Sequence, residues 1–396
     1  MRDLQAATRS TDLEIESVMR MTLSRTAMRI RDRPSTAICV LGAWSVLACL
    51  AGAHPASAQS GLGAPGCSPV ASAPAGAAGC RADEARAQKP RARPFAPGSY
   101  VNKPLRSGTA IDPASSAYAA EFRRQVKRYR PWVNTGQFST PVYTVSRKRK
   151  TVRVRLDTAY SPLQRAWEAV PIPSGARAAA GSDQHLVVWQ PSTDTMWEFW
   201  HLRREADGWH ARWGGRMTRV SRNPGYYDIK RPISRGDAGS GATGSSIPLL
   251  AGLIRGSEME RGSIRHALAV ALPETRPSEW VWPAQRTDGF YWTSGVPRIP
   301  EGARFRLDPR LDVDSLGLSR PATLIARAIQ RYGMVVRDKS GAVSFYAEDP
   351  LTAGARLNEL FTGRPPAQSK LVYLSEAGGF PWQHLQLLSL GEPRSP

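Results

Sequence analysis

Short runs of alternating apolar and polar residues dominate the chain from residue 150 onward. Examples are HLVVWQ at 185–190, TMWEFWHL at 195–202, WHARWGG at 209–215 and AVSFYAED at 342–349. Such alternation, with turn residues between the runs, predicts strands that turn one face toward a core. We therefore expect residues 150–396 to form a mainly β domain, a jelly-roll-like β-sandwich with a few helices.

Two segments have helical spacing instead. In SRPATLIARAIQRYG, residues 319–333, an apolar stripe runs up to a terminal glycine, which predicts a buried helix. SSAYAAEFRRQVKRYR, residues 115–130, has a narrower apolar stripe surrounded by Arg and Lys. This helix and the following RKRK hairpin predict a basic helical N-terminal extension over residues 96–149.

The N-terminal region is typical of an export signal. Three arginines at 29, 31 and 33 precede an apolar run that ends near Ala53, and a small-x-small site follows at 56–58. We expect residues 1–58 to be a signal region that is cleaved after Ala58, with Met28 as a competing start. Lipidation at Cys49 and an uncleaved anchor are the alternatives to cleavage. Either way, the protein is expected outside the cytoplasm, in the periplasm or the exterior.

Residues 59–95 are rich in Ala, Pro and Gly and have few large apolar side chains, so they predict a disordered linker. Cys67 and Cys80 lie within it, and an oxidising compartment favours a disulfide between them.

The net charge of +21 indicates an anionic partner. Removal of residues 1–58 takes away seven arginines and five acidic residues and leaves +19. The densest region is 119–155, which has eleven basic residues and one acidic residue. We expect a polysaccharide or another anionic envelope polymer as the partner. Export makes nucleic acid an unexpected partner, and membrane association requires the lipid or the anchor.

The first two runs predict a β-hairpin whose register decides what meets on each face. If paired residues sum to 386, His185 faces His201 and Trp189 faces Trp197. A second hairpin in which pairs sum to 411 adds His210 to the row. Three imidazoles are weak candidates for a divalent metal, and no cofactor is otherwise expected. A polar strip in a cleft, or three unrelated positions, are the alternatives.

Polysaccharide cleavage would need acid and base groups, and the sequence offers two sets. In a hydrolase, Glu198 beside Trp200 would be the general acid and Asp183 its partner. The alternative is an ion pair between Glu198 and an arginine. In a lyase, His185, Tyr226 or Tyr227 would take the proton next to a uronate carboxylate, which Arg286 would neutralise.

Aromatic residues mark the expected substrate-binding surface. Indole rings stack on sugar faces, and the candidates carrying this role are Trp189, Trp197, Trp209 and Trp282, with Tyr226, Tyr227, Arg286 and Asp288 beside them. Core packing is the alternative for each tryptophan. The GSGATG segment at 239–244 matches GxGxxG but follows no predicted strand, so we interpret it as a flexible loop.

Four stretches resemble a group of secreted bacterial proteins. They are SDQHLVVWQPSTDTMWEFW, GATGSSIPLLAGLIRGSEMERGSIRHALAVALP, WPAQRTDG and IPEGARFRLDP, which together extend roughly from residue 150 to 350. The resemblance implies export and a self-contained domain, and it implies no particular reaction. It adds His266 to the candidate catalytic residues and draws attention to Asp183, His185, Trp282 and Asp288.

Two functions of different classes follow. The first is a glycoside hydrolase or polysaccharide lyase that acts on an anionic or envelope polymer, with Asp183, His185, Glu198 and His266 as catalytic candidates. The second is a non-catalytic sandwich that binds glycan. Release of products from the bound polymer distinguishes the two.

Overall fold

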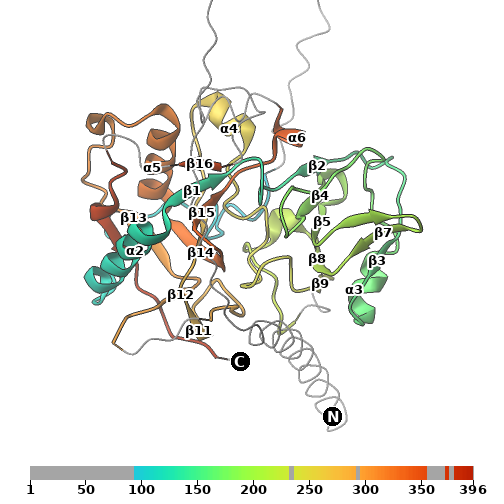
Figure 1. Cartoon of the computed structure of the whole chain (residues 1–396), viewed down its shortest axis with the longest axis horizontal. Coiled ribbons are helices and arrows are strands. Elements are labelled where there is room, and N and C mark those ends of the chain that lie inside the picture. The colour runs from blue at the N-terminus through green and yellow to red at the C-terminus, as the bar shows by residue number, and fades with distance from the viewer. Residues whose placement is uncertain (1–92, 232–235, 291–294, 355–370, 374–378, 396) are drawn as a thin grey trace, which may run out of the picture. The chain divides into compact units, whose positions relative to one another are not determined.

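The computed structural model describes residues 93–231, 236–290, 295–354, 371–373 and 379–395. The predicted signal region, Cys49, the Cys67–Cys80 pair and the linker up to residue 92 lie outside the described residues. Residues Ala85–Pro396 form one compact unit. Its described part is mainly β, and two sheets carry most of it (Figure 1).

The larger sheet has seven strands. In spatial order they are β16 (Leu371–Tyr373), β1 (Pro131–Asn134), β15 (Val343–Tyr346), β10 (Leu268–Leu272), β14 (Met334–Lys339), β13 (Arg304–Leu307) and β17 (Leu385–Leu387). Strand β10 lies at the centre, and all five of its residues are buried. Its alternating pattern divides them between two hydrophobic clusters, with Leu268, Val270 and Leu272 in one cluster and Ala269 and Ala271 in the other.

The second sheet has five strands, in the order β2 (Val142–Thr144), β4 (Leu186–Gln190), β5 (Thr195–Trp200), β8 (Trp213–Thr218) and β9 (Ala238–Gly239). Two smaller sheets accompany it: β3 (Val154–Leu156), β7 (Gly208–Ala211) and β6 (Arg203–Glu205) form one, and β11 (Thr275–Trp280) pairs with β12 (Ile299–Glu301). Strands β1 and β15, β10 and β14, and β2 and β4 pair in parallel. A jelly roll is built from antiparallel strands, and that topology is not confirmed.

The described helices are few: α2 (Ser115–Tyr129), α3 (Ser161–Ala166), α4 (Gly256–Arg261), α5 (Arg320–Tyr332) and α6 (Pro350–Ala353). The predicted buried helix is confirmed as α5, which ends at Gly333 and buries Ile325 and Ile329 completely. Within the described residues, we find no helix with the length and apolar character needed to span a bilayer.

The segment predicted as a basic extension is part of the core. Tyr118 and Phe122 of α2 belong to the hydrophobic cluster of the seven-stranded sheet, and β1 lies within that sheet. Phe95 falls within the predicted linker, but its side chain is buried and its backbone N–H donates to Val220 O. The compact fold therefore begins well before residue 150.

The register of the first hairpin differs by one residue from the predicted one. Leu186 pairs with Phe199 and Val188 with Trp197, so paired residues sum to 385 rather than 386. Strand β5 then pairs with β8, while the second predicted hairpin pairs His210 with Arg203 in the small sheet. Since one residue of slip exchanges the faces of a strand, this shift changes which side chains meet.

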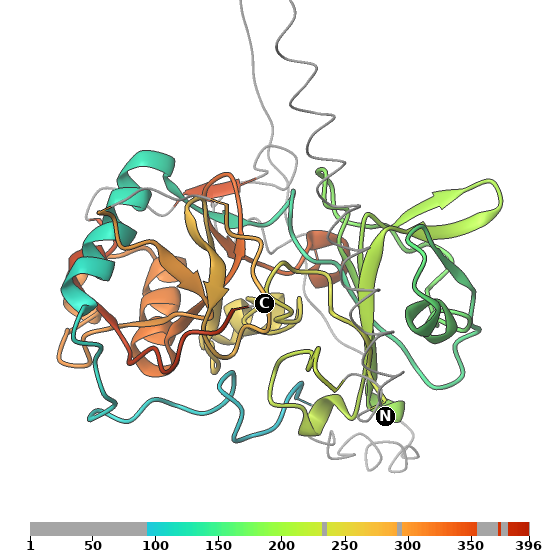
Figure 2. The same cartoon turned by 90° about the horizontal axis from the view of Figure 1, so that it is seen from below.

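The segment after β9 joins the two sheets. In Figures 1 and 2 the yellow chain between residues 239 and 256 lies between them. Its Ile254 N–H donates to Tyr346 of the larger sheet, and its Leu249 N–H donates to Glu198 of the smaller one. The GSGATG loop, interpreted from sequence as flexible, is mostly buried and hydrogen-bonded on both sides.

Candidate functional site

Glu198 anchors the segment that joins the sheets. Its side chain is fully buried, and its two carboxylate oxygens accept hydrogen bonds from Ala242 N (2.8 Å) and Leu249 N (2.9 Å). Burial raises the pKa of Glu198 to about 7, although these two bonds and the charge of Arg337 oppose the shift. Such a pKa suits a general acid, but both oxygens are already engaged with backbone. Glu198 therefore has a structural role: it holds the backbone of the segment that joins the two sheets.

His185 shares the face of Glu198 because of the one-residue shift in register. The ring is buried, and neither nitrogen has a hydrogen-bond partner of normal geometry among the described residues. Burial lowers the pKa of His185 to about 4, and Arg337 adds to this effect, whereas Asp183 and the Ala242 backbone oppose it. A neutral imidazole with so low a pKa is a weak base near neutral pH.

Arg337 occupies the space between the sheets and was not predicted from sequence. The side chain is completely buried, and its guanidinium carbon lies 3.8 Å from the ring centroid of Tyr346. Its Nη1 donates to Leu249 O at 3.2 Å, whereas Nε and Nη2 find no partner in the described structure. We call His185, Glu198, Arg337 and Tyr346 the polar centre.

Three acidic residues lie next to the polar centre: Asp288, Glu301 and Asp338. We call them the carboxyl cluster. Asp338 Oδ1 accepts from Gly244 N at 3.0 Å. Arg286 is tied to the same loop, through Ser246 Oγ at 3.1 Å and Thr243 O at 2.6 Å. Two of the predicted substrate-binding residues, Arg286 and Asp288, thus lie together beside the GSGATG segment.

The remaining tyrosine and histidine candidates have structural surroundings. His266 is buried, and its ring nitrogens contact Glu258 Oε2 (3.0 Å) and Ala267 O (2.8 Å). Tyr227 is buried against Gly215 and Gly241, and this burial raises the pKa of its hydroxyl well above the usual value. That hydroxyl has no hydrogen-bond partner among the residues that the structure describes. Tyr226 is half-buried and held through its backbone. These environments do not favour proton abstraction by Tyr227 or His266.

The tryptophan candidates separate into buried and exposed positions. Trp189 and Trp209 are each 8% exposed and belong to hydrophobic clusters. Trp282, by contrast, is 44% exposed and meets Tyr100 edge-to-face at a centroid distance of 5.5 Å. Asp183 is half-buried and accepts from Trp200 Nε1 at 3.5 Å.

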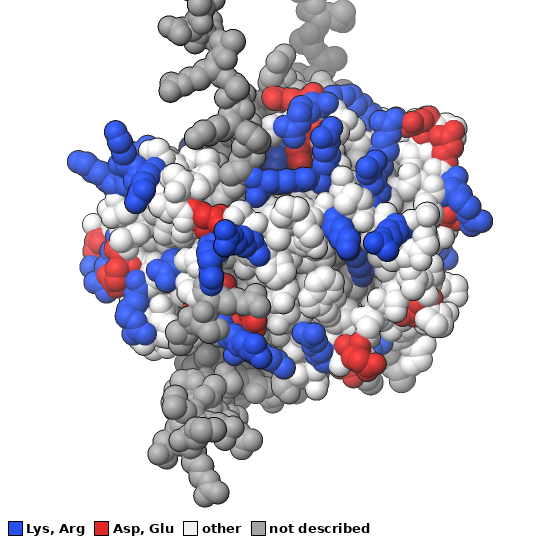
Figure 3. Space-filling view, turned by 180° about the vertical axis from the view of Figure 1, so that it is seen from behind, with Lys and Arg blue, Asp and Glu red and all other residues white. Residues whose placement is uncertain are grey.

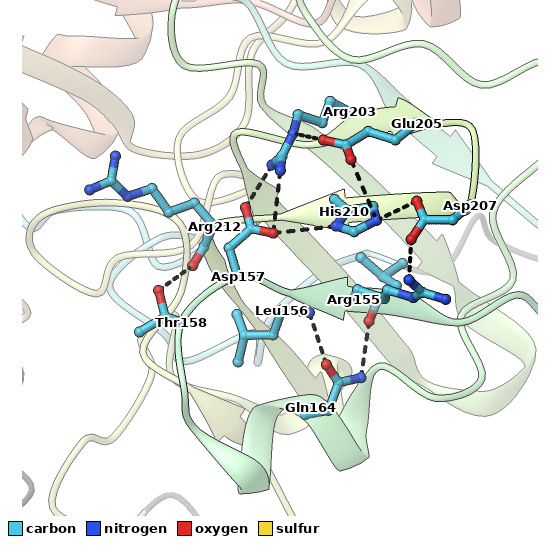
Figure 4. A network of polar contacts seen from close by, with 11 residues as sticks. Arg155, Leu156, Asp157, Thr158, Gln164, Arg203, Glu205, Asp207, His210 and Arg212 are labelled. Atoms are coloured by element: carbon cyan, nitrogen blue, oxygen red, sulfur yellow. Dashed lines mark hydrogen bonds and ion pairs between the residues drawn. The ribbon is translucent and has the colours of Figure 1, made fainter.

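The row of three imidazoles does not form. His201 lies beyond the end of β5, where its φ of +54° takes the chain out of the strand. Figure 4 shows that His210 instead lies in a network on the small sheet, with Nε2 2.9 Å from Asp207 Oδ1 and Nδ1 3.4 Å from Asp157 Oδ1.

Among the described residues, Glu205, Asp207 and His210 are the one group close enough to hold a metal ion. Arg155 already binds Asp207, and Arg203 binds Glu205 at 2.6 Å. These arginines neutralise the two carboxylates, and both carboxylates are exposed, so the group carries no metal assignment.

A pocket of about 310 Å³ opens on the other face of the five-stranded sheet. Trp197 and Arg216, which are cross-strand partners, line it together with Gln190, Thr195 and Thr218. The remaining lining residues are Arg147, Arg149, Thr151, Ala169, Pro171 and Thr193. We call this the Trp197 pocket. It brings the predicted basic loop and one predicted tryptophan together.

The Trp197 pocket is rich in hydrogen-bond donors. Arg147 and Arg149 are exposed, and Arg216 has a buried Nε without a partner in the described structure. Trp197 is 7% exposed and donates through Nε1 to Ala166 O, so it forms part of the wall rather than a free stacking surface. Figure 3 shows Lys and Arg side chains spread across one face of the molecule, with Asp and Glu in fewer places.

Comparison with protein-family models, with curated proteins and with solved structures finds no match to this chain. Function must therefore be argued from the polar centre with its adjoining carboxyl cluster and from the Trp197 pocket.

Sequence reasoning missed three residues from the second half of the chain. Arg337, Asp338 and Glu301 lie in strand runs that read as ordinary sheet segments. Their one signal was a charged residue at a position where alternation predicts an inward-facing side chain, as for Arg337 within GMVVRD. A charged residue at an inward-facing position of an otherwise apolar strand is a useful marker of a buried polar site.

Proposed function

We propose that this protein binds an anionic polysaccharide through the Trp197 pocket. The observation that carries the proposal is the pocket lining: three arginines, several threonines and an indole wall around one small cavity. Guanidinium groups recognise carboxylates and sulfates through paired hydrogen bonds. Threonine hydroxyls and the indole wall suit the hydroxyls and apolar faces of sugar rings.

The overall charge supports the same partner. A net charge of +21 attracts an acidic polymer at long range, while the pocket supplies contacts at short range. The volume is at the lower end of ligand pockets, so we expect one charged sugar unit to enter while the polymer continues over the basic surface. Export, expected from the N-terminal sequence, would place the protein among such polymers.

The basic loop supplies a matched pair of variants for the test. Arg147 and Arg149 line the pocket, whereas Lys148 and Lys150, which alternate with them, do not. The double variants R147S/R149S and K148S/K150S therefore remove equal charge from one exposed loop. Retention would be measured on immobilised polygalacturonate and hyaluronate, with neutral dextran as the control polymer.

We expect R147S/R149S to weaken binding about tenfold, which corresponds to about 1.4 kcal/mol, and K148S/K150S to weaken it much less. Added salt should reduce both effects because exposed charges are screened. Equal losses in the two variants would show a general charge effect without pocket recognition. Retention on dextran equal to that on the acidic polymers would overturn the proposal.

A further inference from the structure

The sheet side of the Trp197 pocket is arranged by the register of three neighbouring strands. Gln190 of β4 pairs with Thr195 of β5, and Thr195 pairs with Thr218 of β8, so these side chains form one row on the same face. The next row on that face contains Trp197 and Arg216, which are also cross-strand partners. All five residues line the pocket. Backbone pairing therefore fixes where these groups lie.

Two lining threonines have already committed their hydroxyl hydrogens within the protein. Thr195 Oγ1 lies 2.9 Å from Thr193 O, and a carbonyl oxygen only accepts, so the Thr195 hydroxyl donates there. Thr193 Oγ1 in turn donates to Gln190 Oε1 at 2.7 Å. The Gln190 amide is oriented by its Nε2, which donates to Ser146 O at 2.9 Å.

The oxygens of Thr193 and Thr195 are consequently acceptors toward a ligand. A hydroxyl oxygen that donates its hydrogen still has two lone pairs. Among the described residues, no donor reaches either oxygen. Both threonines line the pocket, so a ligand that enters it needs hydrogen-bond donors to satisfy them.

The arginines supply the opposite kind of group. A guanidinium has donors only, and Arg147, Arg149 and Arg216 contribute three of them to the lining. Arg216 is held by its Nη2, which donates to Gly236 O at 3.3 Å, whereas Arg147 and Arg149 are exposed. No Asp or Glu is among the described residues that line the pocket. An anion that binds these donors therefore meets no repelling carboxylate in the lining.

These two kinds of group together narrow the chemistry of the ligand. An ionised carboxylate satisfies the guanidinium donors but offers nothing to the threonine oxygens, because it only accepts. A ring hydroxyl on the same sugar unit supplies the missing donor. Both sets of groups line one cavity of about 310 Å³, so a single unit that carries a carboxylate and free hydroxyls can satisfy both.

We propose that the Trp197 pocket selects a uronate unit with unsubstituted ring hydroxyls, and that Thr193 and Thr195 accept hydrogen bonds from those hydroxyls. The inference rests on the proposed binding of an anionic polysaccharide and adds which members of that class are accepted. O-acetylation replaces the hydroxyl hydrogen with an acyl group and leaves the charge of the carboxylate unchanged. A site built to bind a hydroxyl rejects an analogue that lacks it, because its own polar groups are then left unpaired.

The first experiment compares two polymers of equal charge. Polygalacturonate, and the same polymer after chemical O-acetylation that leaves the carboxylates free, are titrated against the full chain. We expect the acetylated polymer to bind about tenfold more weakly, the upper end of what one hydrogen bond contributes. Mild alkaline removal of the acetyl groups should restore the affinity. Polyacrylate, a polyanion without hydroxyls, gives the binding that comes from charge alone.

The matched variants change only threonine hydroxyls. T195V and T193V keep a branched side chain of similar size, and each should lower the affinity for polygalacturonate about tenfold while binding of the acetylated polymer and of polyacrylate stays nearly unchanged. T195S keeps the hydroxyl and should behave like the unaltered protein. T109V is the control, since Thr109 likewise donates to a carbonyl, Arg106 O at 2.8 Å, and does not line the pocket.

The ratio of the two affinities separates hydroxyl recognition from a general loss of structure, which would weaken binding of every polymer together. Equal affinity of the unaltered protein for polygalacturonate and its acetylated form would overturn this inference. The binding proposal would still stand if R147S/R149S weakened both. A preference that persists in both T195V and T193V would overturn the assignment to the threonines. Failure to bind any of the acidic polymers would overturn the binding proposal, and this inference with it.

Discussion

The buried side chain of Glu198 is compatible with two roles, one catalytic and one structural. Beside tryptophans it has the composition of a catalytic acid, and burial does raise its pKa to about 7. Its two backbone donors lie 44 and 51 residues further along the chain, so no local pattern reveals them. The carboxylate is the clamp that holds the joining segment against the five-stranded sheet.

The substitution E198Q tests this role. A glutamine amide can accept only one of the two backbone hydrogen bonds, and the unsatisfied N–H should lower the free energy of unfolding by about 1–3 kcal/mol. Urea unfolding near pH 7 measures this loss. The exposed Glu205 provides the control as E205Q, for which we expect little change.

The pH dependence of that stability has a definite sign. The pKa of Glu198 is higher in the folded protein, at about 7, than its usual 4.5, so the folded state holds the proton more tightly. Its contribution is complete at low pH and is lost as the pH rises from about 4.5 to about 7. In E198Q this part of the decline should vanish. An identical decline in the variant would assign it to other groups.

At the scale of elements, periodic segments were predictable and registers were not. The stripe of α5 and the strand runs at 185–190 and 195–202 come from local spacing, and the structure confirms them as α5, β4 and β5. The pairing of β4 with β5 depends on the turn at 191–194, where Asp194 takes a left-handed conformation. This turn moved the pairing by one residue, which placed His185 on the same face as Glu198 instead of opposite His201.

The GSGATG segment was missed for a related reason. Its hydrogen-bond partners include Asp338, 94 residues away, and a Gly-rich run with no visible partner is usually a mobile loop. Only the assembled sheets show that Gly244 is needed for the close approach of Asp288. Distant partners of this kind are beyond a single sequence.

Helix α5 allows a direct test of the element scale. Ile325 is completely buried against the seven-stranded sheet, and I325A should lower the free energy of unfolding by about 2–5 kcal/mol because it leaves a cavity. Arg327, on the exposed side of the same helix, pairs with Asp314 at 2.5 Å, and R327A should cost less than about 1 kcal/mol. Chemical denaturation of both variants makes the comparison. A cost for I325A as small as that for R327A would contradict the packing.

At the scale of the whole molecule, the two large sheets share a core. One hydrophobic cluster contains Val187 and Met196 from the smaller sheet and Ala269 and Val335 from the larger one. The joining segment packs in the same cluster through Leu249, Leu250 and Leu253. Neither sheet can lose its packing without exposing the other.

We therefore expect residues 85–396 to unfold in one cooperative transition. Scanning calorimetry should give a calorimetric enthalpy close to the van't Hoff enthalpy. Two resolved transitions, or a van't Hoff enthalpy near half the calorimetric one, would show that the sheets are independent and would contradict the shared core.

The alternation along β5 places an evolutionary constraint on this chain. Thr195 and Trp197 face the pocket, while Met196 and Glu198 face the joining segment. Substitutions can remodel one side of the strand without disturbing the other, so the wall of the pocket is free to diverge among descendants while the Glu198 hydrogen bonds are kept. An insertion or deletion of one residue between 195 and 200 would exchange the two sides at once. Lineages derived from this protein should therefore vary these positions in residue type but conserve the length of the strand.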